Sequence, residues 1–229
     1  MPRIHDDEFG DITIRRSSMG SSIKLSIAPN GALRISMPKY APLFMAKRLI
    51  ASSRQKIRSL KVEQQPVISY HDGMQIGKSH HIQITTSAKL QVATHGQTIL
   101  LSIPSGVAIE DSSVQELLRN TIIKALRKEA KSYLPKRLAY LAQQHNFSYQ
   151  KVRFSHASSR WGSCSSNKTI SLNIALMKLD FTLIDYVLIH ELAHTMQMNH
   201  SEAFWDIVES IDPHYKTHRK LLKMQTPSV

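Results

Sequence analysis

The stretch that decides the fold is residues 186–200, which read YVLIHELAHTMQMNH. Its apolar content predicts a buried helix from about residue 182 to 198. Residues four apart on a helix lie about 40° from each other around the axis, so His190 and His194 point the same way and can grip one metal ion. Glu191 is turned about 100° from His190 and therefore lies beside the ion rather than on it. A carboxylate in that place can take a proton from metal-bound water.

Two histidines leave a catalytic zinc ion one protein ligand short, because such ions usually have three. His200, six residues after His194, is the best candidate for the third. The helix must then end and the chain must reverse, and Asn199 can supply the reversal because asparagine tolerates the left-handed conformation. Ser201 is expected to cap the next helix. We therefore expect one zinc ion per chain with these ligands: His190, His194 and His200.

Other side chains could compete for the metal. Glu202 is the alternative third ligand, although carboxylate ligands of this kind generally come from a separate helix further along the chain. His214 and His218 are four apart, but in HYKTHRK they stand among cations that repel a metal. His156 could approach the cleft or be an ordinary loop residue. Cys164 could be an inhibitory fourth ligand, and a small buried hydrophobic side chain is the favoured interpretation.

The N-terminal half has the pattern of a β-rich region. Short alternating stretches are separated by turns from about residue 12 to 104, and Asn30-Gly31 signals a hairpin. Residues 41–60 predict one helix. His80 and His81 alternate across a predicted strand, so they cannot both face one ion. We recognise no internal repeat in the sequence.

The C-terminal half changes in texture at Asp111-Ser112, which opens a long predicted helix to about residue 145, with a bend expected at Pro135. Short strands at KVRF and TISLNIAL flank the loop SHASSRWGSCSSNK, and three helices follow. The fold class expected is α+β. A β-rich N-terminal domain with one helix is expected at residues 1–108, and a C-terminal domain with a small sheet and the HExxH helix at residues 109–229.

The composition sets limits on partners and compartment. Lys and Arg outnumber Asp and Glu by 30 to 17, which gives a net charge of +13 and favours anionic partners such as nucleic acid. The basic residues are spread along the chain, so a solvated basic surface is the favoured interpretation and nucleic acid the alternative partner. A single cysteine, no signal-like apolar start and no membrane-spanning run together predict a cytoplasmic protein. The oligomeric state stays open.

The motifs SSRWGSCSS, SLNIAL, IDYVLIHELAH and NHSEAFW, in that order, resemble the YgjP-like (SprT-like) zincin metallopeptidases. The first half is similar to the N-terminal region of that family through RRSSMGSSIKLSIAPNGALRISMP and DGMQIGKSHHIQI, so the resemblance covers about residues 12–224. It implies a gluzincin-like or minimal zincin core, Glu191 as catalytic acid/base, and zinc on these ligands: His190, His194 and His200. Metzincins share the histidine spacing but have glycine where Gln197 stands here. No particular physiological substrate is implied.

The expected function is that of a zinc metallopeptidase, a hydrolase that cleaves peptide bonds through a zinc-bound water activated by Glu191. Its partner would be a protein or peptide substrate. Two alternatives stay open: a nucleic-acid-associated SprT-like protease, and a non-catalytic binding module whose metal is structural. The intact Glu191 argues against the second alternative.

Further roles are expected for residues around the metal site. The RWGSC motif is expected to form the turn of a hairpin near the metal, where Arg160 could stabilise an oxyanion, bind a substrate carboxylate, or pack structurally against Trp161. Residues 170–175 (ISLNIA) could hold an extended peptide as an additional strand. Phe204 and Trp205 are expected to pack beneath the metal.

Overall fold

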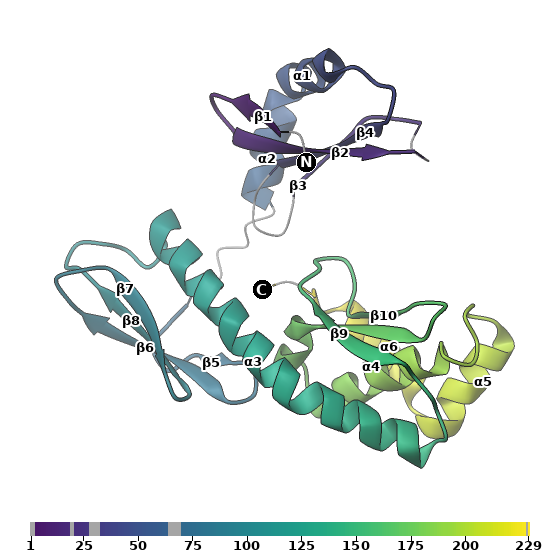
Figure 1. Ribbon diagram of the computed structural model, residues 1–229. Coiled ribbons are helices and arrows are strands. Elements are labelled where there is room, and N and C mark those ends of the chain that lie inside the picture. Colours follow the sequence, from purple (N-terminus) through teal and green to yellow (C-terminus); the bar gives the residue numbers. More distant parts are fainter. Residues whose placement is uncertain (1–2, 19–20, 28–32, 64–69, 228) are drawn as a thin grey trace. The chain divides into compact units, whose positions relative to one another are not determined.

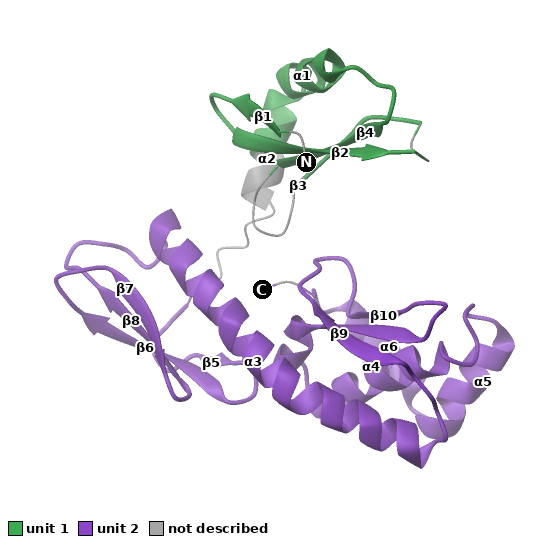
Figure 2. Cartoon of the chain, viewed as in Figure 1, with its two compact units in different colours: residues 1–68 green, residues 69–229 purple. Residues whose placement is uncertain are grey.

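The computed structural model describes residues 3–18, 21–27, 33–63, 70–227 and 229 of the 229-residue chain. The chain divides into two compact units, residues 1–68 and 69–229 (Figure 2). The boundary expected between residues 108 and 109 lies inside the second unit. There, helix α3 (Ser112–Gln144) packs against strands β7 (Gln91–His95) and β8 (Thr98–Ile103), which joins the second set of strands to the C-terminal half.

Unit 1 is a four-stranded sheet with two helices. Its strands are β1 (Arg3–Asp6), β2 (Gly10–Ser17), β3 (Lys24–Ile27) and β4 (Leu33–Pro38), in the order β1-β2-β4-β3 with β2 and β4 parallel. Apolar side chains of the sheet and helices form one core. The helix expected at residues 41–60 is two helices, α1 (Leu43–Ser52) and α2 (Arg54–Glu63), which meet at Ser53. The expected Asn30-Gly31 hairpin lies outside the described residues.

Unit 2 begins with a second four-stranded sheet. Its strands are β5 (Gln75–Ile76), β6 (His80–Thr86), β7 and β8, in the order β5-β6-β8-β7 with β6 and β8 parallel. His80 is buried and His81 is exposed. The two histidines therefore alternate across β6 as the sequence predicts.

The two sheets have the same topology, and their registers coincide. In each sheet, the first and second strands of the chain pair antiparallel, the second and fourth pair parallel, and the third pairs antiparallel with the fourth. A helix follows the fourth strand in the chain. With this pairing, ISMP at residues 35–38 aligns with LSIP at residues 101–104. The statement that the chain has no internal repeat is therefore wrong. Apolar residues that pair with one another across three neighbouring strands occupy the same positions in both sheets. They are Ile14, Ile35 and Leu25 in unit 1, and Ile84, Leu101 and Val92 in unit 2.

The rest of unit 2 is a small sheet covered by helices (Figure 1). Its strands are β9 (Lys151–Ser155), β10 (Gly162–Cys164) and β11 (Thr169–Asn173), in the order β10-β11-β9. A 3₁₀ helix, η1 (Ile174–Lys178), and the helices α4 (Phe181–Ala193), α5 (Glu202–Ile211) and α6 (Tyr215–Lys223) follow. The mixed α+β class is confirmed. Among the described residues, no helix is long and apolar enough to cross a membrane.

Helix α3 connects the two parts of unit 2. It continues through Pro135 as one helix of 33 residues. Near its end, Arg137 forms a two-point ion pair with Asp185 of α4, with Nε to Oδ1 at 2.8 Å and an Nη to Oδ2 at 2.7 Å. Bidentate pairs of this kind fix orientation as well as distance. The position of α4 is therefore tied to α3.

Near the middle of α3, the buried Glu129 carboxylate holds the turn between β5 and β6. It accepts hydrogen bonds from the backbone amides of Lys78 at 2.7 Å and Ser79 at 2.9 Å, and from the ring of His80. Gly77 makes this approach available, because a Cβ there would lie 2.3 Å from Glu129 Oε2. Burial raises the pKa of Glu129, but the donors outweigh burial and the net pKa is lowered.

Glu129→Ala should lower the free energy of unfolding by about 3 kcal/mol, because it leaves several buried donors without an acceptor. The measurement is a urea titration, with Glu116→Ala, an exposed position on the same helix, as the matched control. Because the folded pKa of Glu129 is below the unfolded value of about 4.3, its contribution is complete above that pH and is lost as the pH falls through the folded pKa. Equal midpoints for both variants would contradict the assignment.

Candidate metal centre

Helix α4 ends earlier than the sequence predicts, at Ala193 instead of about residue 198. The backbone tightens after it, because Thr195 N donates to Leu192 O at 2.9 Å and Met196 N donates to Ala193 O at 3.0 Å. Shorter i to i+3 bonds of this kind are common at helix ends. The reversal therefore begins directly after His194.

The expected left-handed turn at Asn199 is wrong. Among the described residues, only Asn146 and Lys168 have positive φ without being glycine. Gln197 fixes the reversal instead: its backbone carbonyl lies 3.1 Å from His194 Nδ1, and its side-chain Nε2 donates to Ser201 Oγ at 3.0 Å. Ser201 occupies the N-cap position of α5 as predicted, but its hydroxyl makes no capping bond.

The turn brings together the three histidines that the sequence singled out. One nitrogen of each imidazole lies within 4.8 Å of the others, and these rings form a group that could hold a metal ion: His190, His194 and His200. The Nε2 atoms of His190 and His200 are 3.1 Å apart. This is the one such group of histidine, cysteine and carboxylate side chains within the described residues.

The electrostatics of the three rings suit a cation. Burial lowers the pKa of His190 to about 3, with smaller effects from the neighbouring His194 and His200, and burial also lowers the pKa of His194. A neutral His194 that donates from Nδ1 to the Gln197 carbonyl has its lone pair on Nε2. Nδ1 of His190 is buried and has no hydrogen-bond partner among the described residues. Three imidazole nitrogens match the donor set of catalytic zinc.

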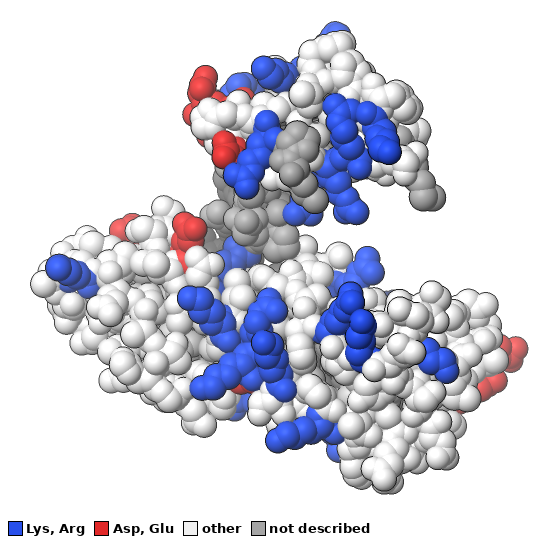
Figure 3. All heavy atoms as spheres, in the orientation of Figure 1, with Lys and Arg blue, Asp and Glu red and all other residues white. Residues whose placement is uncertain are grey.

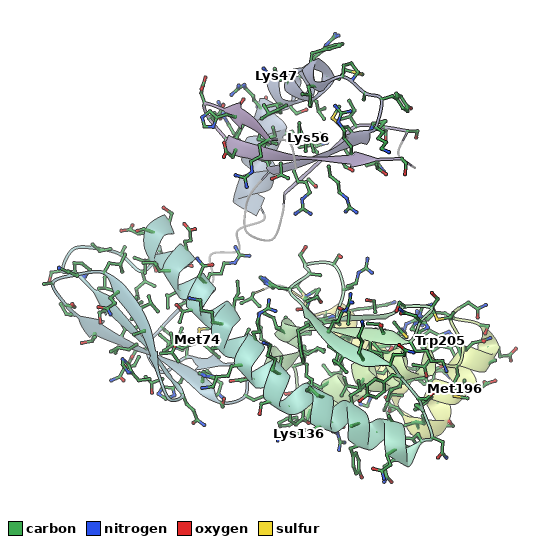
Figure 4. The ribbon with its side chains drawn as sticks, in the orientation of Figure 1. Lys47, Lys56, Met74, Lys136, Met196 and Trp205 are labelled. Atoms are coloured by element: carbon green, nitrogen blue, oxygen red, sulfur yellow. The ribbon has the colours of Figure 1, made fainter. Side chains whose placement is uncertain are left out.

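Two aromatic side chains of α5 pack against the imidazole rings. Phe204 of α5 is fully buried, and its ring centroid lies 4.9, 4.5 and 4.8 Å from those of His190, His194 and His200. Trp205 stacks on His200 at 5.6 Å (Figure 4 labels Trp205). The expected packing of both aromatic residues against this group is confirmed.

Behind Trp205 lie two residues that the sequence analysis did not single out. Tyr215 stacks on Trp205 with ring centroids 5.2 Å apart, and the Arg219 guanidinium lies 4.7 Å from the centroid of the indole ring. Both come from α6, where HYKTHRK shows only a cationic helix in the sequence. No motif marks these two residues in the sequence. The packing of α6 on α4 places them against Trp205, which in turn stacks on His200.

Glu191 is 5% exposed and lies with its carboxyl group against β10. A Cβ placed on Gly162 would be 2.5 Å from Glu191 Oε1 and 2.8 Å from its Cδ. Burial raises the pKa of Glu191 to about 8, and the charge of Arg160 lowers it. Oε2 is buried without a hydrogen-bond partner in the described part of the chain. The carboxyl group is thus shielded from water, on the residue that follows His190 in α4.

Asn173 is the residue that the sequence analysis missed in this region. It is fully buried at the end of β11, and its Nδ2 donates to the carbonyls of Ala157 at 2.6 Å and Arg160 at 2.9 Å. Its Oδ1 accepts from the amide of Ala175 at 3.0 Å. The loop that carries the exposed Arg160 is therefore anchored through the backbone of that residue.

The rival ligands lie apart from the three histidines. The nitrogen Nδ1 of His218 lies 2.7 Å from Asp212 Oδ2, and its ring centroid is 6.5 Å from that of His214. Neither of these, nor His156, Cys164 or Glu202, belongs to the group of converging ligand atoms. Cys164 is half-buried, and its thiol donates to the Ser165 carbonyl at 3.5 Å.

The small sheet offers a free edge at a different strand from the one expected. β11 is paired with β9 on one side and β10 on the other, so the prediction that residues 170–175 accept a further strand is wrong. The RWGSC motif is not the hairpin turn either, because its last three residues form β10. Trp161 O accepts from Asn173 N and Ser165 N donates to Thr169 O. Alternation in an antiparallel pair therefore directs the backbone groups of Gly162 and Cys164 outward.

A comparison with protein families places the chain among metal-dependent peptidases. The model of the YgjP-like family, a metallopeptidase domain, matches residues 21–225. The chain belongs to the YgjP-like metallopeptidase family. This family implies a peptidase, a hydrolase, with a divalent metal ion.

A search of curated proteins gives no match. Among solved structures, the crystal structure of the metallopeptidase zymogen of Pyrococcus abyssi abylysin aligns with 28% identity. The alignment covers 42% of this chain and 98% of that chain, with a TM-score of 0.37.

Proposed function

We propose that the protein is a zinc-dependent metallopeptidase that hydrolyses peptide bonds, with Glu191 as the catalytic acid/base and zinc held by His190, His194 and His200. The observation that carries this proposal is the convergence of three imidazole nitrogens within 4.8 Å beside a buried carboxyl group. Neutral imidazoles are the preferred nitrogen ligands of zinc, and burial lowers the pKa of His190 and His194.

When bound, zinc supplies a Lewis acid that lowers the pKa of water to about 7 and polarises a carbonyl group. Glu191 accepts a proton from the attacking water and delivers it to the nitrogen of the leaving amine. Burial suits this role, because it raises the pKa of Glu191 and makes its carboxylate a stronger base than a solvated one. Arg160, whose charge acts on Glu191, is proposed to hold the developing oxyanion or a substrate carboxylate.

The substrate is proposed to bind as an extended peptide along β10. The outward backbone groups of Gly162 and Cys164 lie on the free edge of the sheet, and strand addition there uses main-chain hydrogen bonds. Such binding demands little of the side chains of the peptide. It therefore favours flexible or unfolded protein segments as substrates.

Nucleic acid is a second candidate partner, because exposed basic residues gather on α3 and β9 (Figure 3). Lys124, Lys128 and Lys131 are exposed and lie within about 60° of one another around the axis of α3. Lys151 and Arg153 are exposed on β9, against which α3 packs. Clustered cations of this kind fit the phosphate backbone of a nucleic acid.

The first prediction from the proposed function concerns metal content. The purified protein should hold about one zinc ion per chain, and His190→Ala or His194→Ala should abolish it because two remaining ligands bind weakly. His200→Ala should weaken zinc binding strongly, whereas Glu202→Ala, the matched control, should leave it near wild type. The measurement is elemental analysis after gel filtration. Zinc retained in the histidine variants and lost in Glu202→Ala would show a different ligand set.

The second prediction separates metal binding from chemistry. Glu191→Gln keeps the shape of the side chain but removes the base, so hydrolysis should fall at least ~10²-fold while zinc content persists. Casein and a peptide library serve as substrates, and Glu116→Gln, an exposed change on α3, serves as the control. Activity that survives in Glu191→Gln would exclude Glu191 as the base.

The third prediction tests the basic residues of α3. In anisotropy titrations with a fluorescent DNA duplex, the combined Lys124→Ala, Lys128→Ala and Lys131→Ala variant should reduce the slope of log K against log salt by about 3, if each lysine meets one phosphate. The control combines Lys220→Ala with Lys223→Ala, two exposed positions on α6. Identical salt slopes for the wild type and the α3 variant would leave no role for this surface.

A further inference from the structure

We propose that Gly162 is a positioning residue for Glu191, because the place that a Cβ would take on β10 is occupied by the carboxyl group of Glu191. A Cβ on Gly162 would lie 2.5 Å from Oε1, 2.7 Å from Cγ and 2.8 Å from Cδ of Glu191. Separations below about 3.0 Å do not occur between non-bonded carbon atoms in packed interiors, since close packing leaves no such overlap. Only glycine therefore fits opposite this side chain.

The backbone of β10 gives no other reason for a glycine. Gly162 is absent from the glycines with positive φ, which include Gly77 and Gly96. It pairs with Leu172 in a regular antiparallel register, a conformation open to any residue. The requirement for glycine at this position comes from the contact with Glu191 and not from chain geometry.

Glu191 has little freedom to move away from a new Cβ. Its side chain is buried, and its neighbours Leu188 and Leu192 on α4 are fully buried. The helix itself packs on β10 and is tied to α3 by the Arg137–Asp185 pair. A side chain at position 162 would therefore displace the carboxyl group or push β10 away from α4.

Gly162 also belongs to the proposed peptide-binding edge. The alternation of β10 directs its backbone groups outward from the sheet. Gly162 therefore contacts the Glu191 carboxyl group through its Cα and would contact the substrate peptide through its backbone N–H and C=O. This one residue sets the separation between the carboxyl group and the peptide. This part of the inference rests on the proposed function, in which Glu191 exchanges protons with groups at the scissile bond.

Gly162→Ala should lower kcat by about 10²-fold, the size expected for a misplacement of roughly 1 Å in a catalytic group, with little change in KM. Zinc content should stay at the wild-type value, because the three histidines are untouched. The matched control is Ser166→Ala, an exposed position in the turn that follows β10. Its kcat should stay within about twofold of wild type, because substitutions at the surface usually have small effects.

A double-mutant cycle in thermal stability tests the contact without any activity measurement. Gly162→Ala should lower Tm by about 5 °C in the wild-type background, because the added methyl group overpacks the contact. In the Glu191→Ala background the carboxyl group is gone, so the same change should cost almost nothing. Because that double variant has room for the methyl group, it also keeps the test valid if Gly162→Ala alone fails to fold.

The outcomes separate this inference from the proposed function. Equal losses of Tm in both backgrounds would overturn the inference, as would a Gly162→Ala variant with wild-type kcat. A third outcome is that Gly162→Ala lowers Tm only when Glu191 is present, while the wild-type protein binds zinc but cleaves no peptide. That outcome would refute the proposed function and leave the positioning of Glu191 by Gly162 in place.

Discussion

The structure depends on the burial of the Glu191 carboxyl group and the His194 imidazole, together with the half-buried His190, at the end of α4. Leaving polar groups without partners in an apolar environment costs several kcal/mol, and Glu191 Oε2 and His190 Nδ1 are both in that state among the described residues. The surrounding core offsets the cost: Phe204, Leu188 and Leu192 are fully buried around this group. A fold that retains such groups together is organised around what they do, since a stable core alone would place apolar side chains there.

The repeated sheet motif explains how the centre is held. In unit 2 the helix that follows the second sheet is α3, which extends far beyond the strands it covers. Glu129 near its middle binds the turn of the second sheet, and Arg137 binds Asp185 on α4. Two charged contacts eight residues apart thus link a β-module to the helix that carries His190 and Glu191. The second sheet is thereby connected to the helix that carries two of the candidate metal ligands.

The sequence predicts the local parts of this arrangement and misses the long-range ones. The HExxH helix and the approach of His200 follow from helical periodicity and short spacing. The reversal before His200 does not, because it uses the carbonyl of Gln197 and a tightened helix end rather than a left-handed Asn199. The sequence does not reveal the repeated sheet, because the two copies share few identical residues. The strand registers are the clearest evidence for it. The contact of Gly162 with Glu191 joins residues that no periodicity relates, and β10 is only three residues long.

Burial shifts the pKa values of His190 and Glu191 in opposite directions. Burial disfavours charge, so it lowers the pKa of His190 to about 3 and raises the pKa of Glu191 to about 8. The same desolvation keeps an imidazole lone pair available and raises the pKa of a carboxyl group toward neutral pH, which is what the proposed roles of metal ligand and acid/base require. Arg160 opposes the second effect through its charge, yet it is exposed, so solvent weakens it. In the proposed function, a substrate that covers Arg160 would strengthen the effect of its charge on Glu191, and peptide binding at the β10 edge would thereby change the acidity of this carboxyl group.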